Sequence, residues 1–188
     1  MLGCYDFCGH YEWTFEWMSQ RGGEPLLREY WDEAIHRDSQ RHAIELIGSK
    51  GIEGMKEYWG HTLVDEGAGY HCTATDTVFR TDMHECPSKG FLIRNGLHQH
   101  HDYCDHCMGW IGPLLKECGW VVDHEHNHCG QCWWELRRAT DPTRPGKPGE
   151  LSGEHDVRKS AGWLPPHGTM DVYERANAPH DKTTRKVD

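Results

Sequence analysis

The spacing of apolar residues changes near residue 67, and this change limits the fold more than any other feature of the chain. Before it, apolar side chains recur every three or four residues, which is typical of amphipathic helices. After it, stretches rich in threonine, valine and aromatic residues alternate with a period of two, which is typical of strands with one buried face. Helices followed by strands favour an α+β fold.

Three helices are expected in the first part of the chain. The first covers residues 5–21 and ends at Gly22-Gly23, a pair that interrupts helical periodicity. The second begins at Glu24-Pro25, because proline suits the first helical turn, and runs to about Ile47. The third covers residues 51–66.

Strand-like sequence follows in residues 70–86, where alternation is expected to place Asp82, His84 and Cys86 on one face. Three side chains with catalytic or metal-binding chemistry would then point the same way.

The next segment alternates between helical and strand patterns. We expect a short helix from Pro87 to Gly96 and a longer, cysteine-bearing helix from about Asp102 to Cys118. Residues 120–126 and 131–138 are expected to pair as a hairpin. The predicted fold is therefore α+β, with N-terminal helices followed by an antiparallel sheet that a cysteine-bearing helix interrupts.

The last fifty residues differ in composition from the rest. Residues 139–188 hold six of the nine prolines and no cysteine. We therefore expect an α+β domain over residues 1–138 and a Pro/Gly-rich polar tail over residues 139–188 that is extended or disordered. Such a tail could support a homo-oligomer by wrapping a neighbouring subunit.

Charge and motifs exclude several classes of partner. The formal net charge is −10, and residues 1–138 hold 22 acidic and 12 basic side chains, with no basic stripe for nucleic acid. No apolar run reaches the roughly 18 residues that span a membrane, and no signal-peptide pattern opens the chain, so we expect a cytoplasmic protein. A Gly-rich phosphate loop is missing, which argues against a nucleotide cofactor, and a GxSxG elbow is missing, which argues against serine-hydrolase chemistry.

Thiols and imidazoles are concentrated in one part of the chain. The segment from Cys86 to Cys132 holds six of the nine cysteines, and eight of the sixteen histidines lie in it or just before it. In a reducing compartment, this density indicates metal binding or thiol chemistry.

Two CxxC pairs indicate a zinc or iron site. Cys104 and Cys107 form the first pair and Cys129 and Cys132 the second, with 21 residues between the pairs. A structural metal, a catalytic or regulatory metal and metal-free thiols all remain open as interpretations.

A row of histidines adds further candidate ligands. His124, His126 and His128 alternate, so a strand would place them on one face, with Cys132 across the hairpin and His126 as a ligand. The alternative is a solvent-exposed polar face.

The cysteine-bearing helix also suggests thiol catalysis. At a helix N-terminus the dipole lowers a thiol pKa, so Cys104 or Cys107 is expected to be a thiolate near neutral pH, with Asp105 close by. The alternative is that Cys107 and Cys118 are small buried hydrophobic residues.

The order of several short motifs resembles that of the L-2-amino-thiazoline-4-carboxylic acid hydrolase-like family. The motifs are listed here in chain order: His10-Tyr-x-Trp13, Phe79-Arg-Thr81, Glu85-Cys86-Pro87, Cys104-Asp105 and Gly130-Gln-Cys132-Trp-Trp-Glu135. The resemblance covers about residues 5–138, its specific part residues 79–136. It implies a hydrolase-like α+β domain that acts on a small amidine or thiazoline ring. Cys107, Cys129 and the histidine row are additions to the family pattern, and they favour a metal.

Our first functional hypothesis is hydrolysis of a C–N or C–S bond in a small heterocycle or amide. Cys86 or Cys104 would be the thiolate nucleophile. His84, Asp82 or Asp105 would transfer protons. In a variant, Cys104, Cys132 and His126 hold zinc or iron that activates water.

Two other classes remain open. One is a metal-containing module that senses or binds a small molecule without turnover. The other is a thiol redox protein that uses Cys104 and Cys107, although the βαβ setting of such proteins is missing.

Overall fold

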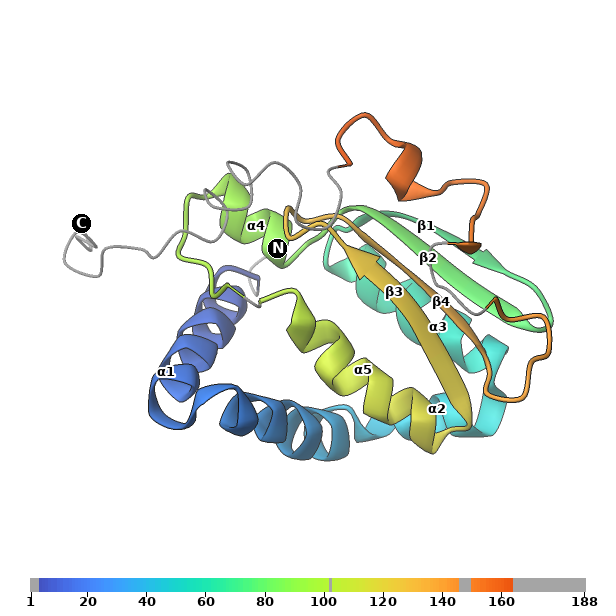
Figure 1. Cartoon of the computed structure of the whole chain (residues 1–188), viewed down its shortest axis with the longest axis horizontal. Coiled ribbons are helices and arrows are strands. Elements are labelled where there is room, and N and C mark those ends of the chain that lie inside the picture. Colours follow the sequence, from blue (N-terminus) through green and yellow to red (C-terminus); the bar gives the residue numbers. More distant parts are fainter. Residues whose placement is uncertain (1–3, 102, 146–149, 164–188) are drawn as a thin grey trace.

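The structure is a computed structural model that describes residues 4–101, 103–145 and 150–163. Its helical first part comprises α1 (Cys4–Tyr30), η1 (Trp31–Ser39), α2 (Arg41–Lys50) and α3 (Ile52–Asp65). The later elements are β1 (Gly69–Ala74), β2 (Val78–Glu85), α4 (Lys89–Arg94), α5 (Asp105–Glu117), β3 (Trp120–His126), β4 (Cys132–Arg138) and η3 (Val157–Lys159). Helices first and an antiparallel sheet interrupted by a cysteine-bearing helix confirm the predicted fold class (Figure 1).

The first helices differ from the prediction in where they break. Gly23 has a left-handed φ of 67° and kinks α1 at the predicted point. The predicted second helix is divided at Gln40, because η1 is a π-helix whose wider turn closes with a bond from Gln40 N to Ile35 O of 2.8 Å. α2 then continues to Lys50, beyond the predicted end near Ile47.

The sheet has the strand order β1-β2-β4-β3, and all its pairs are antiparallel. The expectation of one strand over residues 70–86 is wrong, because β1 and β2 form a hairpin around a turn. In that turn, the Thr75 hydroxyl accepts hydrogen bonds from the backbone N–H groups of Thr77 and Val78, at 3.3 and 3.1 Å. The predicted hairpin of β3 and β4 is confirmed.

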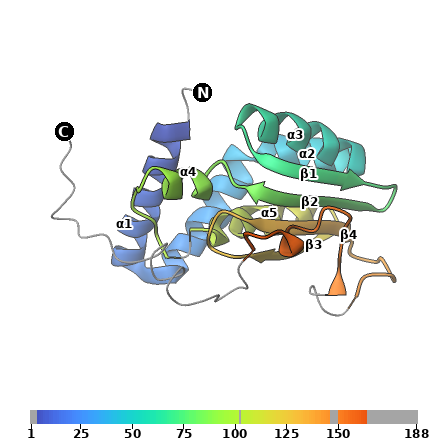
Figure 2. The ribbon, with the colours of Figure 1, turned by 90° about the horizontal axis from the view of Figure 1, so that it is seen from above.

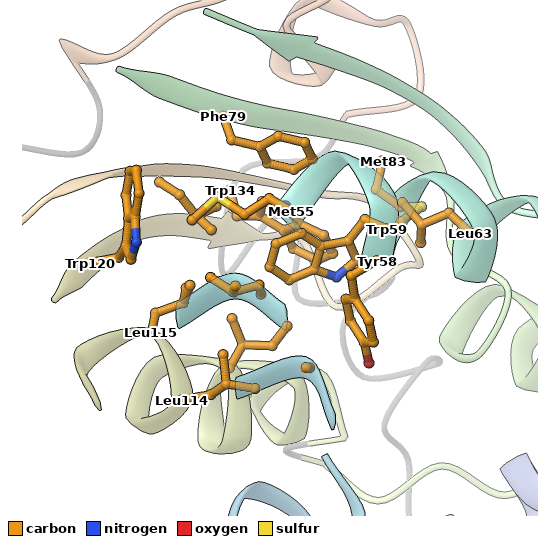
Figure 3. Close-up of a cluster of buried hydrophobic side chains, with 14 residues drawn as sticks. Met55, Tyr58, Trp59, Leu63, Phe79, Met83, Leu114, Leu115, Trp120 and Trp134 are labelled. Atoms are coloured by element: carbon orange, nitrogen blue, oxygen red, sulfur yellow. The ribbon is translucent and has the colours of Figure 1, made fainter. Parts of the chain in front are cut away.

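The main core lies between one face of the sheet and helices α2, α3 and α5 (Figure 3). Trp59 of α3 stacks on Phe79 of β2 with ring centroids 5.4 Å apart, and its ring lies 5.9 Å from that of Trp134. Met83 and Leu136 are buried in the same layer. Burial of these large side chains supplies the main driving force for joining the helices to the sheet.

A second apolar cluster joins α1 to α4 and α5 at one end of the sheet (Figure 2). Phe15 is fully buried there, and its ring meets Trp31 edge to face at 5.6 Å. Gly109 lets α5 approach η1, because a Cβ at this position would lie 2.5 Å from the Trp31 ring. This close approach places the start of α5 beside α1.

Part of the predicted tail packs on the outer face of the sheet. Leu151 and Val157 are buried against Trp133, whose ring also contacts the guanidinium groups of Arg80 and Arg158, each 4.6 Å from its centroid. Residues 150–163 are therefore not the extended tail that we expected. Residues 146–149 and 164–188 of that predicted tail lie outside the described residues.

Candidate metal centre and pocket

Three segments converge where β2, α5 and the β3–β4 turn meet. Cys86 follows β2, and its N–H donates to the Gly130 carbonyl at 2.8 Å. Gly130 has a φ of 87°, and a Cβ there would lie 3.1 Å from the Gly90 Cα, so only glycine lets the turn approach α4 this closely. The contact brings the residues around Cys86 to the tip of the hairpin.

Cys104, His126 and His128 form a candidate metal site at this junction. Their ligand atoms all lie within 4.8 Å of one another, and within the described ranges this is the only group of three or more such residues that meets this limit. Cys104 is the residue before α5, His126 ends β3, and His128 lies in the turn after it. The site therefore combines one thiol with two imidazoles.

Asp105 orients one of these imidazoles. The Nε2 of His126 donates to Asp105 Oδ1 at 2.8 Å, and this hydrogen bond is the main cause that lowers the pKa of Asp105. The other ring nitrogen, Nδ1, is buried and has no hydrogen-bond partner within the described structure. A carboxylate on one nitrogen and a lone pair left on the other is the arrangement of metal-binding histidines.

His128 reaches the site through an unusual backbone conformation. Its φ of 56° is the one positive value among the non-glycine residues that the structure describes. The Asn127 side chain holds the turn, because its Oδ1 accepts from Cys129 N at 2.9 Å and Gln131 N at 3.1 Å. Strained residues of this kind are found preferentially at functional sites.

The thiols here are not activated as we expected. Burial raises the pKa of Cys104 to about 12, although the nearby Lys89 acts in the opposite direction. Burial also raises the pKa of Cys107 and Cys132 well above the usual thiol value, and it raises that of Cys86. The prediction of a thiolate at the start of α5 is therefore wrong for the metal-free protein, because desolvation outweighs the helix dipole.

A pocket of about 610 Å³ lies next to the candidate metal site. Cys86, Cys107 and Cys132 line it together with aromatic side chains such as Tyr11 and Trp110. The triad residues are absent from this lining but are joined to it, because Cys132 pairs with His126 across the hairpin and Cys107 lies one turn after Cys104. An apolar pocket of this size suits a small, flat molecule.

His106 is a functional candidate in the pocket wall that our sequence prediction did not single out. Its Nδ1–H donates to the Tyr103 carbonyl, which leaves Nε2 as the acceptor atom, 3.6 Å from the Cys107 thiol. Burial lowers the pKa of His106 to about 4, so the ring is neutral at pH 7. Its place inside the CxxC pair was the one available signal in the sequence.

Asp82 and His84 lie away from this pocket, contrary to the expectation that they share a face with Cys86. The Asp82 carboxylate accepts from Arg80 Nε at 2.7 Å and from Val157 N at 3.0 Å on the outer face of the sheet. The His84 ring meets His71 edge to face, with centroids 5.3 Å apart. Cys86 departs from the strand alternation because it follows the end of β2 and packs on the inner side.

The candidate metal ligands in the structure differ in part from those predicted from the sequence. Cys104 and His126 stand together as expected, and His126 lies opposite Cys132 in the hairpin register. Cys107, Cys129 and Cys132 are not members of the close group, so the described residues do not assemble the four-thiol site suggested by the two CxxC pairs. The added ligand is His128, which belonged to the histidine row but not to our ligand set.

Comparisons with known proteins give no match: neither family models, nor curated proteins, nor solved structures match the chain. The resemblance to the thiazoline hydrolase-like family therefore rests on the motifs alone. Within the described part of the chain, no helix is long and apolar enough to cross a membrane.

Proposed function

We propose that the chain is a metal-dependent hydrolase that cleaves a C–N or C–S bond in a small heterocycle, amidine or amide. The observation that carries this proposal is the convergence of Cys104, His126 and His128, with Asp105 orienting one imidazole. Three protein ligands leave a coordination position open, as in catalytic zinc sites. Zinc and iron both suit a donor set of one thiolate and two imidazoles.

The pocket supports a small and mostly apolar substrate. Trp59 and Trp134 line it together with three thiol-bearing residues, so a flat ring could pack against aromatic and sulfur-containing side chains. The neutral Nε2 of His106 lies in the same wall and can accept a proton from water or from a substrate N–H. A bound metal ion would supply Lewis-acid activation of water or of the scissile group.

A free thiolate nucleophile has less support. Burial raises the pKa of both Cys86 and Cys104, so neither thiol is ionised to a useful extent at pH 7 without a metal. Binding of a metal ion at Cys104 would remove this penalty, because coordination deprotonates a thiol outright. We therefore favour the metal-dependent form of the hypothesis.

The test is hydrolysis of a panel of thiazoline, amidine and amide compounds by protein with and without metal. We expect turnover by zinc- or iron-loaded protein, its loss after chelation and its return when the metal is restored. A His126→Ala variant should be inactive, whereas His61→Ala, on an exposed face of α3, should match the wild type. Turnover that survives complete demetallation would overturn the metal-dependent mechanism.

A binding or sensing module without turnover is the second candidate. It is favoured by the absence of the triad residues from the pocket lining, since a catalytic ion must reach its substrate. In that case the metal-loaded protein would bind compounds from the panel, as measured by calorimetry, but would convert none of them.

A further inference from the structure

The pocket next to the candidate metal site is lined by acidic side chains but not by basic ones. Its two carboxylates belong to Asp65 and Glu66 at the end of α3, and both side chains are accessible to solvent at its opening. No lysine or arginine is among the lining residues that the structure describes. Burial lowers the pKa of His106 in the wall to about 4, so its ring carries no charge at pH 7. The charge on the pocket wall is therefore negative.

These two carboxylates are not balanced by a neighbouring cation. Among the residues that the structure describes, neither of them has an ion-pair partner, whereas Glu53 of the same helix pairs with Lys56 at 2.9 Å. Burial of part of the Glu66 side chain raises its pKa, because desolvation disfavours the charged form. A cation bound beside Glu66 would offset this cost.

Two hydroxyl groups in the pocket wall are available as hydrogen-bond acceptors. The Tyr58 hydroxyl donates to Gln40 Oε1 at 2.6 Å, and the Thr62 hydroxyl donates to the Tyr58 carbonyl at 2.9 Å. Because both protons are already used, only the lone pairs of these hydroxyl oxygens remain available to a ligand. Together with Glu66, they favour a ligand that donates hydrogen bonds.

Aromatic rings make up much of the same wall. The rings of Tyr58 and Trp59 meet edge to face at 5.4 Å, and the ring of Trp134 lies 5.9 Å from that of Trp59 (Figure 3). Burial and then the charge of Glu66 raise the pKa of Tyr58 to about 12, so this carboxylate acts electrostatically on the aromatic wall. A flat ring with a positive charge would combine stacking with cation–π attraction here.

We infer that this pocket binds a flat ring that carries an amidinium, guanidinium or ammonium group, and that Glu66 sets the preference for that charge. The inference deepens the proposed function and rests on it where the ligand is a substrate, because it selects cationic amidines from the compounds considered there. It disfavours heterocyclic carboxylates. Lys89 lies near the thiols of Cys86 and Cys104 but does not line the pocket, and burial lowers its pKa, so it offers a carboxylate no contact.

The test measures binding to the metal-free full chain by calorimetry. The three probes have nearly the same shape and differ in charge: 2-naphthamidine, 2-naphthamide and 2-naphthoate. Leaving out the metal makes the result independent of turnover and of the positive charge that a metal ion would add. We expect one naphthamidine per chain, bound about tenfold more tightly than the neutral amide, and no measurable binding of naphthoate.

Variants then assign the preference to Glu66. Glu66→Gln should remove most of the preference for naphthamidine and leave binding of the neutral amide unchanged. Glu29→Gln is the control and should bind like the wild type, because it changes an exposed glutamate of α1 outside the pocket lining. The inference is overturned if the wild type binds the amide or naphthoate as tightly as naphthamidine, if it binds none of the three, or if the preference survives in Glu66→Gln. The first two of these results come from the wild type, so they do not depend on how the variant folds.

This test and the test of hydrolysis can fail separately. Preferential binding of naphthamidine without turnover of any compound in the panel would support the inference and contradict the hydrolase proposal. Turnover of neutral or anionic compounds in preference to cationic ones would support the hydrolase proposal and contradict the inference.

Discussion

The desolvated thiol of Cys104 should make metal binding at the triad steeply dependent on pH. Burial raises the pKa of Cys104 from 9.0 to about 12, and a metal ion must displace this proton. The apparent affinity should therefore rise about tenfold per pH unit from pH 7 to beyond pH 10. The three-unit shift costs ~4 kcal/mol of binding free energy at neutral pH, relative to an ordinary thiol.

His124 does not contribute to this dependence above pH 7. Burial lowers the pKa of His124, the neighbour of His126 in the histidine row, to about 3, so its ring is neutral throughout the range. The Cys104→Ser control below tests whether the pH dependence above neutrality arises from this thiol.

The assay is titration with Cd²⁺ against a competing chelator, followed by the sulfur-to-cadmium charge-transfer absorbance in the ultraviolet. The Cys104→Ser variant is the control and should show neither the absorbance nor the pH dependence. An affinity that levels off near pH 9 would mean that the thiol is solvated like that of a free cysteine. A flat profile from pH 7 would mean that a thiolate is already present, and either result would refute the reasoning.

Three further outcomes are expected. Asp105→Asn should weaken metal binding by about 10–100-fold in the same titration, because it alters the partner that orients His126; an unchanged affinity would exclude that role. Val157→Ala should lower the free energy of unfolding by about 1–2 kcal/mol in urea, whereas the exposed Val64→Ala should change it little; equal effects would contradict packing of residues 150–163. In metal-free, reduced protein the raised pKa of Cys104 makes the folded state hold a proton that the unfolded state loses above about pH 9. The contribution of Cys104 to stability should therefore be complete below that pH and fall by ~1.4 kcal/mol between pH 8 and 10. It is measured as the difference from Cys104→Ser, because the other buried thiols add to the total, and a difference that does not change would argue against burial of this thiol.

Much of the fold follows from local sequence patterns. The apolar spacing of the first helices, the alternation in residues 120–138 and the break at Gly23 each reflect interactions within a few residues, and each agrees with the structure. The turn at Thr75 was not predicted. It is held by hydrogen bonds from backbone N–H groups to a hydroxyl, and such bonds do not change the spacing of apolar residues. The π-helical η1 likewise has no distinct apolar pattern.

The candidate site was only partly predictable, for a related reason. The alternation of histidines placed His126 opposite Cys132, which the strand register confirms. Which thiol joins the imidazoles depends on how the start of α5 docks against the hairpin tip, and this docking selects Cys104 over Cys107. The spacing of a CxxC pair carries no information about that contact.

The sequence by itself determined the order of helices and strands, the acidic surface and the concentration of thiols and histidines between Cys86 and Cys132. Only the tertiary structure decided which of these groups lie close together and whether the thiols are protonated. It buried the thiols, so that desolvation opposes their ionisation, and it placed Glu12 against His98 across 86 positions of sequence. Burial and long-range contact arise from packing between distant elements, and local sequence patterns do not record them.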